Sequence, residues 1–100
     1  MKPLTSAQRK RLRGLAHDLK PIVHLGKAGL TDAALTQIDK ELADHELIKI
    51  RFLGGKEEKD ALVTEMEERL QCGSAGRVGH VAILYRAHPD PEKRQVDPGK

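Results

Sequence analysis

The segment between Lys20 and Thr31 constrains the fold of this chain more than any other part of the sequence. Residues 22–25 form a short apolar run, Ile-Val-His-Leu, bounded by Pro21 and Gly26, which is typical of a β-strand. Thr31 is a favourable helix N-cap, because its hydroxyl can accept a hydrogen bond from the first helical turn. The segment therefore predicts a strand that passes through a short glycine-bracketed loop into a helix.

The loop itself reads Gly26-Lys27-Ala28-Gly29. Two glycines around a lysine let a backbone approach a phosphate chain, and the following helix N-terminus offers free N–H groups to the same anion. KH domains grip single-stranded RNA with a G-x-x-G loop of this kind. Taken alone the motif is unspecific, because glycines mark many strand-to-helix turns for conformational reasons. It predicts either a nucleic-acid clamp or a plain turn.

Before this segment, the spacing predicts a first helix at roughly residues 6–17. Thr5 and Gln8 have the spacing of a capping box, and the approach to Pro21 ends the helix. Apolar residues at helical spacing would form its inner stripe, namely Leu12, Leu15, Ala16 and Leu19. Three cations fall to one side of that stripe: Arg9, Lys10 and Arg13.

The middle of the chain predicts a second helix from Thr31 to about residue 44 and a strand over residues 47–52. The helix would turn Ala34, Leu35, Ile38 and Leu42 inward. In the strand, Ile48, Ile50 and Phe52 alternate with Lys49 and Arg51. One face of that strand therefore goes to the core, and the other carries two cations.

The last part of the sequence predicts a third helix at about residues 56–71, with Gly73 as its C-cap. A weak strand at 75–78 would turn through Gly79-His80 into a strong strand at 81–85. The polar remainder from residue 87 to residue 100 is expected to be a mobile tail.

These elements predict the α/β class, in the order helix-strand-helix-strand-helix-strand-strand. Strand–helix–strand units imply parallel pairing with right-handed crossovers, and the final hairpin adds an antiparallel strand. One hundred residues suffice for a single compact domain. We expect a four-stranded mixed sheet packed by helices over residues 1–86, followed by the polar tail 87–100.

Charge is distributed unevenly along the chain. Residues 1–30 hold seven Lys or Arg and one Asp, whereas residues 31–72 hold six basic and eleven acidic side chains. A positive field gathered around the glycine loop favours one polyanion-binding face. An ordinary solvated helix face is the alternative for the basic run of the first helix.

Other classes of function find little support in the sequence. The single cysteine, Cys72, cannot form an internal disulfide, and no apolar run has the length of a signal peptide or membrane span. We therefore expect a cytoplasmic protein. The five histidines lack metal-ligand spacing, and no catalytic motif is present, so neither an enzyme nor a cofactor is expected. His24 is interpreted as a core or edge histidine of a short strand.

Four groups of residues, in order and over roughly residues 5–86, carry a family resemblance. They are Leu15-Ala16-His17 with Lys20-Pro21, Gly26-Lys27-Ala28-Gly29-Leu30-Thr31, His45-Glu46-Leu47-Ile48-Lys49, and Leu84-Tyr85-Arg86. With them the chain closely resembles the stand-alone, YhbY-type members of the CRM (chloroplast RNA splicing and ribosome maturation) family. The sequence departs from the family at Gly79-His80, where Gly-Lys is common, and in the less apolar strand at 75–78.

The resemblance implies an RNA-binding domain similar to the C-terminal domain of translation initiation factor three. It also implies association with precursors of the large ribosomal subunit. The expected RNA contact is the loop Gly26, Lys27, Ala28 and Gly29, with amides of Lys27 to Gly29 and the next helix N-terminus meeting phosphates. Further cations would extend the track: Arg9, Lys10, Arg13, Lys20, Lys49 and Arg51.

Recognition of base identity is expected to be weak, because the two large aromatics, Phe52 and Tyr85, are expected in the core. The expected partner is ribosomal RNA in the pre-ribosomal large subunit, bound by a monomer, with no membrane and no small-molecule substrate. The alternative is a protein-interaction adaptor that uses acidic helix faces. Its residues would be Asp32, Asp39, Glu57, Glu58, Glu65 and Glu68.

Overall fold

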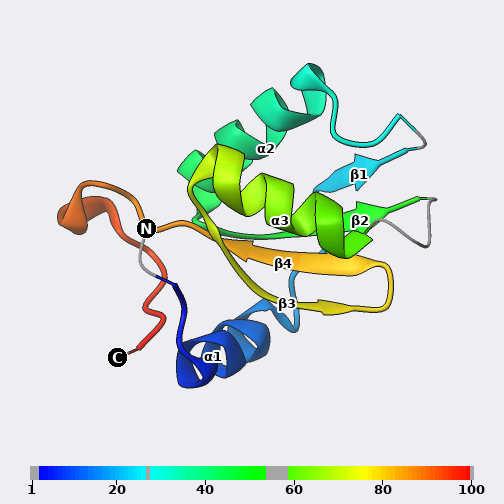
Figure 1. Ribbon diagram of the computed structural model, residues 1–100. Coiled ribbons are helices and arrows are strands. Elements are labelled where there is room, and N and C mark those ends of the chain that lie inside the picture. The colour runs from blue at the N-terminus through cyan, green and yellow to red at the C-terminus, as the bar shows by residue number, and fades with distance from the viewer. Residues whose placement is uncertain (1–2, 27, 54–58, 100) are drawn as a thin grey trace.

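A computed structural model of the chain describes residues 3–26, 28–53 and 59–99 (Figure 1). Within these residues the elements are α1 (Ser6–Ala16), β1 (Val23–Leu25), α2 (Asp32–His45), β2 (Leu47–Phe52), α3 (Lys59–Leu70), β3 (Gly73–Val78), β4 (Val81–Tyr85) and a short 3-10 helix (Pro91–Lys93). The predicted class and element order are confirmed. The predicted start of the third helix at Lys56 lies outside the described residues.

The four strands form one mixed sheet in the order β1-β2-β4-β3. β1 and β2 are parallel and are joined by α2, whereas β4 runs antiparallel to both of its neighbours. Val23 pairs with Ile50 and Leu25 with Phe52, so β1 and β2 end at the same edge of the sheet. Their carboxyl ends therefore lie side by side.

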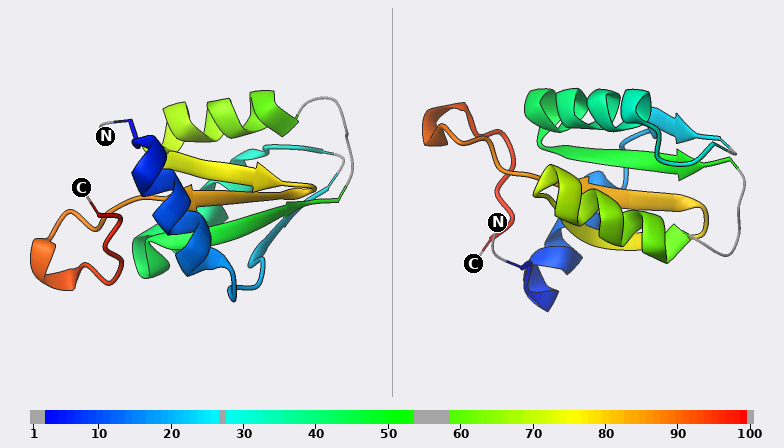
Figure 2. Two further views of the ribbon diagram at one scale, coloured as in Figure 1. Left: turned by 90° about the horizontal axis from the view of Figure 1, so that it is seen from below. Right: turned by 45° about the horizontal axis from the view of Figure 1, so that its top comes forward.

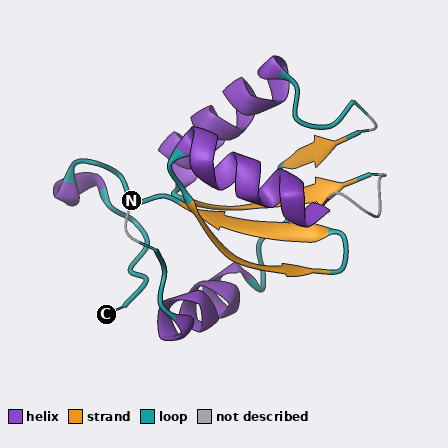
Figure 3. Cartoon of the chain, in the orientation of Figure 1, coloured by secondary structure: helices purple, strands orange, loops and turns teal. Residues whose placement is uncertain are grey.

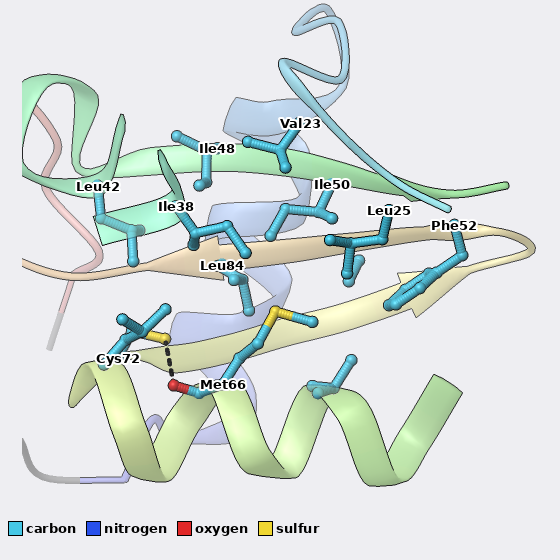
Figure 4. Packing of buried hydrophobic residues seen from close by; sticks show 13 residues of the cluster. Val23, Leu25, Ile38, Leu42, Ile48, Ile50, Phe52, Met66, Cys72 and Leu84 are labelled. Atoms are coloured by element: carbon cyan, nitrogen blue, oxygen red, sulfur yellow. Dashed lines mark hydrogen bonds between the residues drawn. The ribbon is translucent and has the colours of Figure 1, made fainter. Parts of the chain in front are cut away.

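Helices α2 and α3 cover one face of the sheet, and α1 lies on the other (Figures 1, 2 and 3). The larger core fills the space under α2 and α3, where Ile38, Ile50, Met66 and Leu84 are almost fully buried (Figure 4). This arrangement confirms the inward residues predicted for the second helix and the second strand. The alternation of β2 follows directly from the two-residue period of a strand.

The second core cluster, under α1, is smaller. Leu12 and Ala16 are buried there against Ala75, Ile83 and Tyr85. Two residues of the predicted stripe do not follow, because Leu15 and Leu19 remain 47% and 40% exposed. One helix about 10 Å across covers only part of a four-stranded sheet. α1 contacts mainly β3, so part of its apolar side faces solvent.

Helix ends follow their sequence signals in two of three cases. Thr5 and Gln8 form the predicted capping box, and the Thr31 hydroxyl accepts the N–H of Ala34. The predicted C-cap Gly73 is wrong, because Gly73 already belongs to β3. The left-handed turn after α3 is made instead by Gln71, at φ 51°.

The prediction of a loose C-terminal tail is wrong for the described residues up to 99. The segment returns along the molecule and lies beside α1 (Figure 2, left). Val96 packs against the second core cluster, and the Gln8 side-chain amide donates to the carbonyl of Gly99 at 3.0 Å. A mobile tail is predicted because the segment is polar, but hydrogen bonds to its backbone hold most of it in place.

Candidate nucleic-acid interface

The glycine loop stands at one end of the sheet, which we call the loop end. Three segments meet there: the loop of residues 26–29, Leu53 after β2, and the Gly79-His80 turn between β3 and β4 (Figure 1). The Leu53 amide donates to the carbonyl of Leu25 at 2.7 Å, and the Phe52 amide donates to the carbonyl of His80 at 2.8 Å. The first bond fixes the base of the glycine loop against the end of β2, and the second ties the end of β2 to the turn before β4.

The loop closes on itself through two backbone hydrogen bonds. The Gly29 amide donates to the carbonyl of Gly26 at 3.0 Å, and the Thr31 amide donates to the carbonyl of Gly29 at 3.1 Å. Gly29 has φ 70°, a conformation that glycine adopts without strain. The Gly29 amide is therefore engaged within the loop, which corrects the expectation that it meets a phosphate. Lys27 lies outside the described residues.

Gly26, unlike Gly29, does not have a backbone conformation that requires glycine. Its φ lies outside the left-handed region, and a Cβ built there would meet nothing within 4 Å. Neither conformation nor packing in the isolated protein requires a glycine at this position. The missing side chain leaves open space beside the backbone of the loop.

The N-terminus of α2 follows the loop directly. The first N–H groups of a helix have no partner inside it, and at Ala34 that need is met by the Thr31 hydroxyl at 3.1 Å. The amides of Asp32 and Ala33 precede this bond and belong to the same first turn. The Asp32 carboxylate lies in that turn as well and opposes an anion there. The N-terminus of α2 thus offers N–H donors to an anion, and the nearby Asp32 carboxylate weakens that attraction.

Three of the predicted cations are used inside the protein. Arg13 donates to the carbonyl of Ala75 at 2.7 Å and so fastens α1 to β3. The Lys49 ammonium donates to the carbonyls of His17 and Leu19, at 3.3 and 3.0 Å. Arg9 bonds locally to the carbonyl of Leu4 and to the Ser6 hydroxyl. Their guanidinium and ammonium groups hold α1 and its flanks in place.

The other predicted cations are Lys10, Lys20 and Arg51. All three are exposed and make no hydrogen bond or ion pair with other described residues. Arg51 stands opposite His24 in the parallel pairing of β1 and β2. It precedes Phe52 by one residue, so it lies close to the loop end. Arg51 thus lies near the carboxyl end of β2, whereas Lys10 lies in α1 and Lys20 follows it.

A groove of about 360 Å³ lies between α1 and the sheet on this face. Arg13, His17 and Lys49 supply its polar lining. His24 is also exposed on the sheet, so its interpretation as a core histidine is wrong, and the edge-strand interpretation is right. Its alternation with buried Val23 and Leu25 was the sequence signal, because a period of two places it on the opposite face.

A contact at the β3–β4 turn had no sequence signal. Lys59, only 4% exposed, contacts Nδ1 of His80 with its ammonium group. Arg77 adds an ion pair to Asp60 at 3.0 Å and donates to the carbonyl of Gly79. The turn is thereby fastened to the start of α3.

The side chains of Phe52, Tyr85 and Cys72 are buried and stay out of the interface. Phe52 and Tyr85 are 4% and 3% exposed, as predicted. Burial, followed by the charge of Glu67, raises the pKa of the Cys72 thiol to about 12. That thiol is therefore protonated and a poor nucleophile at neutral pH.

The described residues contain neither a candidate metal site nor a candidate membrane span. No group of His, Cys, Asp or Glu within the described ranges could hold a metal ion. Over the same ranges, none of the helices combines the length and apolar character that a membrane crossing requires.

Two of the acidic residues of the adaptor interpretation are paired with cations of the protein. Asp39 pairs with Arg86 at 2.7 Å, and Glu65 pairs with Arg69 at 3.1 Å along α3. Glu57 and Glu58 lie outside the described residues. Within the described part of the chain, Asp39 and Glu65 thus each form a surface ion pair with an arginine, as acidic residues on solvated helix faces do.

Comparison with known proteins finds relatives whose names all refer to RNA binding. A Haemophilus influenzae RNA-binding protein is 37% identical over 87 residues, which are 86% of this chain and 88% of that protein. A Bacillus subtilis protein inferred to bind RNA is 34% identical over 98 residues, covering 94% and 97% of the two chains. A solution structure from Staphylococcus aureus, of a protein proposed to bind RNA, matches with a TM-score of 0.79 at 29% identity. That match covers 94% of this chain and 99% of the other.

These relatives are named as binding proteins rather than enzymes. The model of the CRS1/YhbY (CRM) domain matches residues 4–86, a range that includes the glycine loop and the three α-helices and four strands seen in the described residues. The chain belongs to the CRS1/YhbY (CRM) domain family.

Proposed function

We propose that this protein binds RNA at the loop end of its sheet and acts on ribosomal RNA in large-subunit precursors. The observation that carries the proposal is Gly26, which neither the backbone conformation nor the packing of the free protein requires. A backbone without a side chain at this point lets another chain approach closely. The kinship with named RNA-binding proteins supports RNA as that other chain.

The phosphate contacts would come from three sources. The loop would supply the amide of Ala28 and the ammonium of Lys27, and the first turn of α2 would supply further N–H donors. Arg51 would continue the positive track from the loop along the open sheet face, and Lys20 and Lys10 would meet more distant phosphates. Arg9, Arg13 and Lys49 would contribute to the field of that face while their polar atoms hold α1.

Such an interface reads the RNA backbone and shape more than the bases. Single-strand RNA modules usually stack unpaired bases on aromatic side chains. Phe52 and Tyr85 are buried, so neither offers a stacking platform. We therefore expect weak sequence preference in the binding of structured ribosomal RNA. We further propose that the protein acts as a monomer in the cytoplasm.

The test compares wild-type protein with Lys27→Glu by titration of fluorescent ribosomal RNA fragments at several salt concentrations. Phosphate contacts predict a steep fall of affinity with salt and a slope smaller by about one unit for the variant. Lys93→Glu, in the exposed 3-10 helix, is the matched charge reversal away from the loop end.

A parallel experiment follows both proteins with ribosomal particles by cosedimentation at low and moderate salt. Wild-type protein should travel with large-subunit precursors, and the folded Lys27→Glu variant should be lost from them. A flat salt profile together with equal cosedimentation would reject the loop as the RNA site and favour the adaptor.

A further inference from the structure

A second groove, of about 660 Å³, lies away from the loop end. We call it the α1 groove. Its floor is the start of β2, and its walls are the outer side of α1 and the C-terminal segment at residues 95–97. Figure 2 (left) shows that segment running beside α1. The groove is therefore built by parts of the chain that are far apart in sequence.

Apolar side chains gather in this groove. Leu15, Leu19 and Ile22 line it and are 47%, 40% and 39% exposed. They are three of the five large exposed hydrophobic residues in the described ranges; the other two are Leu53 and Val78. Contiguous exposed apolar groups with a polar border mark interaction sites on soluble proteins. Leu15 and Leu19 belong to the stripe that is predicted to face the core, and together with Ile22 they form this exposed patch.

The outer wall of the groove is held by a buried carboxylate. Glu46 is 1% exposed and accepts the amides of His88, at 2.8 Å, and of Gln95 and Val96, the latter at 3.0 Å. We call these contacts the Glu46 latch. Arg11 adds a bond to the carbonyl of Asp97 at 2.7 Å. The groove thus has a fixed wall in the free protein, as a pre-organised binding site needs.

The border of the groove is positive. Lys20 lines it and makes no hydrogen bond or ion pair with other described residues, and Arg11 lines it with only its Nε engaged. The one acidic lining residue, Asp97, accepts the amide of Gly99 at 2.9 Å. His45 borders the groove at 3.4 Å from Glu41. Cations around an aliphatic floor complement an acidic, amphipathic partner.

We propose that the α1 groove binds an acidic amphipathic helix of a protein partner. Leucine-sized side chains at helical spacing would enter between Leu15, Leu19 and Ile22, and flanking carboxylates would meet Lys20 and Arg11. A second copy of this chain would bring like charges together at the border. Single-stranded RNA would find no Phe, Tyr or Trp among the lining residues on which to stack. Both are therefore disfavoured as occupants.

The test uses two synthetic helical peptides that carry leucines at positions i, i+3, i+4 and i+7. One has glutamate on the flanks of the leucine stripe, and the other has lysine at the same positions. Titration into the ¹⁵N-labelled full chain should move the amide resonances of residues 15–22 and 95–97 with the glutamate peptide. The lysine peptide should bind at least about tenfold more weakly.

Two variants link binding to the groove. Leu19→Glu should abolish binding of the glutamate peptide, and Val78→Glu, which places the same charge at an exposed apolar site on β3, should leave it intact. The amide spectra of both variants establish that they are folded. Each should keep the wild-type thermal stability to within a few degrees, because Leu19 and Val78 are 40% and 66% exposed and belong to neither core cluster.

Three results would overturn the proposal. The first is equal binding of the two peptides, or no shift at the groove with either. The second is a concentration-dependent dimer in sedimentation velocity that Leu19→Glu dissociates, which would assign the groove to a second copy. The third is a shift of the same resonances by a single-stranded RNA oligonucleotide. Because the peptide titration contains no RNA, it stands or falls separately from the RNA-binding proposal.

Discussion

The two ends of the sheet use their polar groups in opposite ways. At the end that carries Glu46, a buried carboxylate gathers three backbone amides and ties the C-terminal segment to the domain. At the loop end, Gly26 leaves open space, and the first turn of α2 has only one amide satisfied by its N-cap side chain. The first end satisfies backbone amides of a distant segment with a carboxylate, whereas the second leaves the earlier amides of the α2 turn without a side-chain partner among the described residues.

The comparison shows that a charged residue near a surface is informative only when its partners are known. From the sequence, Arg13 and Lys49 are predicted to contact RNA. In the structure both donate hydrogen bonds that hold α1 and the segment after it to the rest of the domain. Arg51, from the same strand as Lys49, is exposed on the open part of the sheet. Alternation in a strand assigns a face, and the helix on that face decides which cation remains accessible.

The largest effect is expected from Glu46→Ala. The substitution leaves three amides without their carboxylate in a part-buried place, so we expect a loss of about 3 kcal/mol in the free energy of unfolding. Urea denaturation followed by circular dichroism measures it. The control is Glu41→Ala, in the last part of α2 just before Glu46. Glu41 pairs with exposed His45, so this change should alter stability by less than about 0.5 kcal/mol. Similar losses in both variants would contradict the latch.

Acid should weaken the same latch by a smaller amount. Burial raises the pKa of Glu46, but the amides of His88, Gln95 and Val96 and the charge of His88 lower it more, so the pKa lies below its ordinary value. A lowered pKa in the folded protein means that the contribution is complete above the unfolded value. It is lost as the pH falls below about 4. The protection factors of the amides of residues 95 and 96 should fall over that range while the larger core stays protected.

At the loop end, Gly29→Ala should lower stability by about 1 kcal/mol, because alanine is strained at φ 70°. The matched control is Gly14→Ala. Gly14 is helical, and a Cβ there meets nothing within 4 Å, so this change should raise stability by about 0.5–1 kcal/mol. Thermal melting of both variants provides the comparison, and an unchanged Gly29→Ala midpoint would refute the strain.

The smallest change in stability is expected for Gly26→Ala, within about 0.5 kcal/mol of wild type, because neither φ nor packing opposes a methyl group. RNA affinity should nevertheless fall, since the methyl group occupies space that the ligand backbone needs. Fluorescence anisotropy with a ribosomal RNA fragment measures the affinity. Unchanged RNA affinity would show that Gly26 does not face the bound RNA.

Much of the fold could be predicted because its signals are local. The capping box at Thr5, the N-cap at Thr31 and the alternation of residues 47–52 each depend on neighbours within a few positions. The position of the glycine loop followed from the same signals. The Lys59 contact to His80 could not be predicted, because it joins residues 21 positions apart with no pattern between them.

The sequence by itself determined the element order, the mixed sheet, the main core and the place of the glycine loop. Periodicity and capping are short-range properties, and they act before any distant part of the chain is positioned. Only the tertiary structure decided which cations are engaged, that the C-terminal segment returns to Glu46, and that Leu15 and Leu19 face a groove. Those outcomes depend on which surfaces meet when the sheet forms, because a hydrogen bond or a buried contact needs two partners whose separation only the complete fold sets.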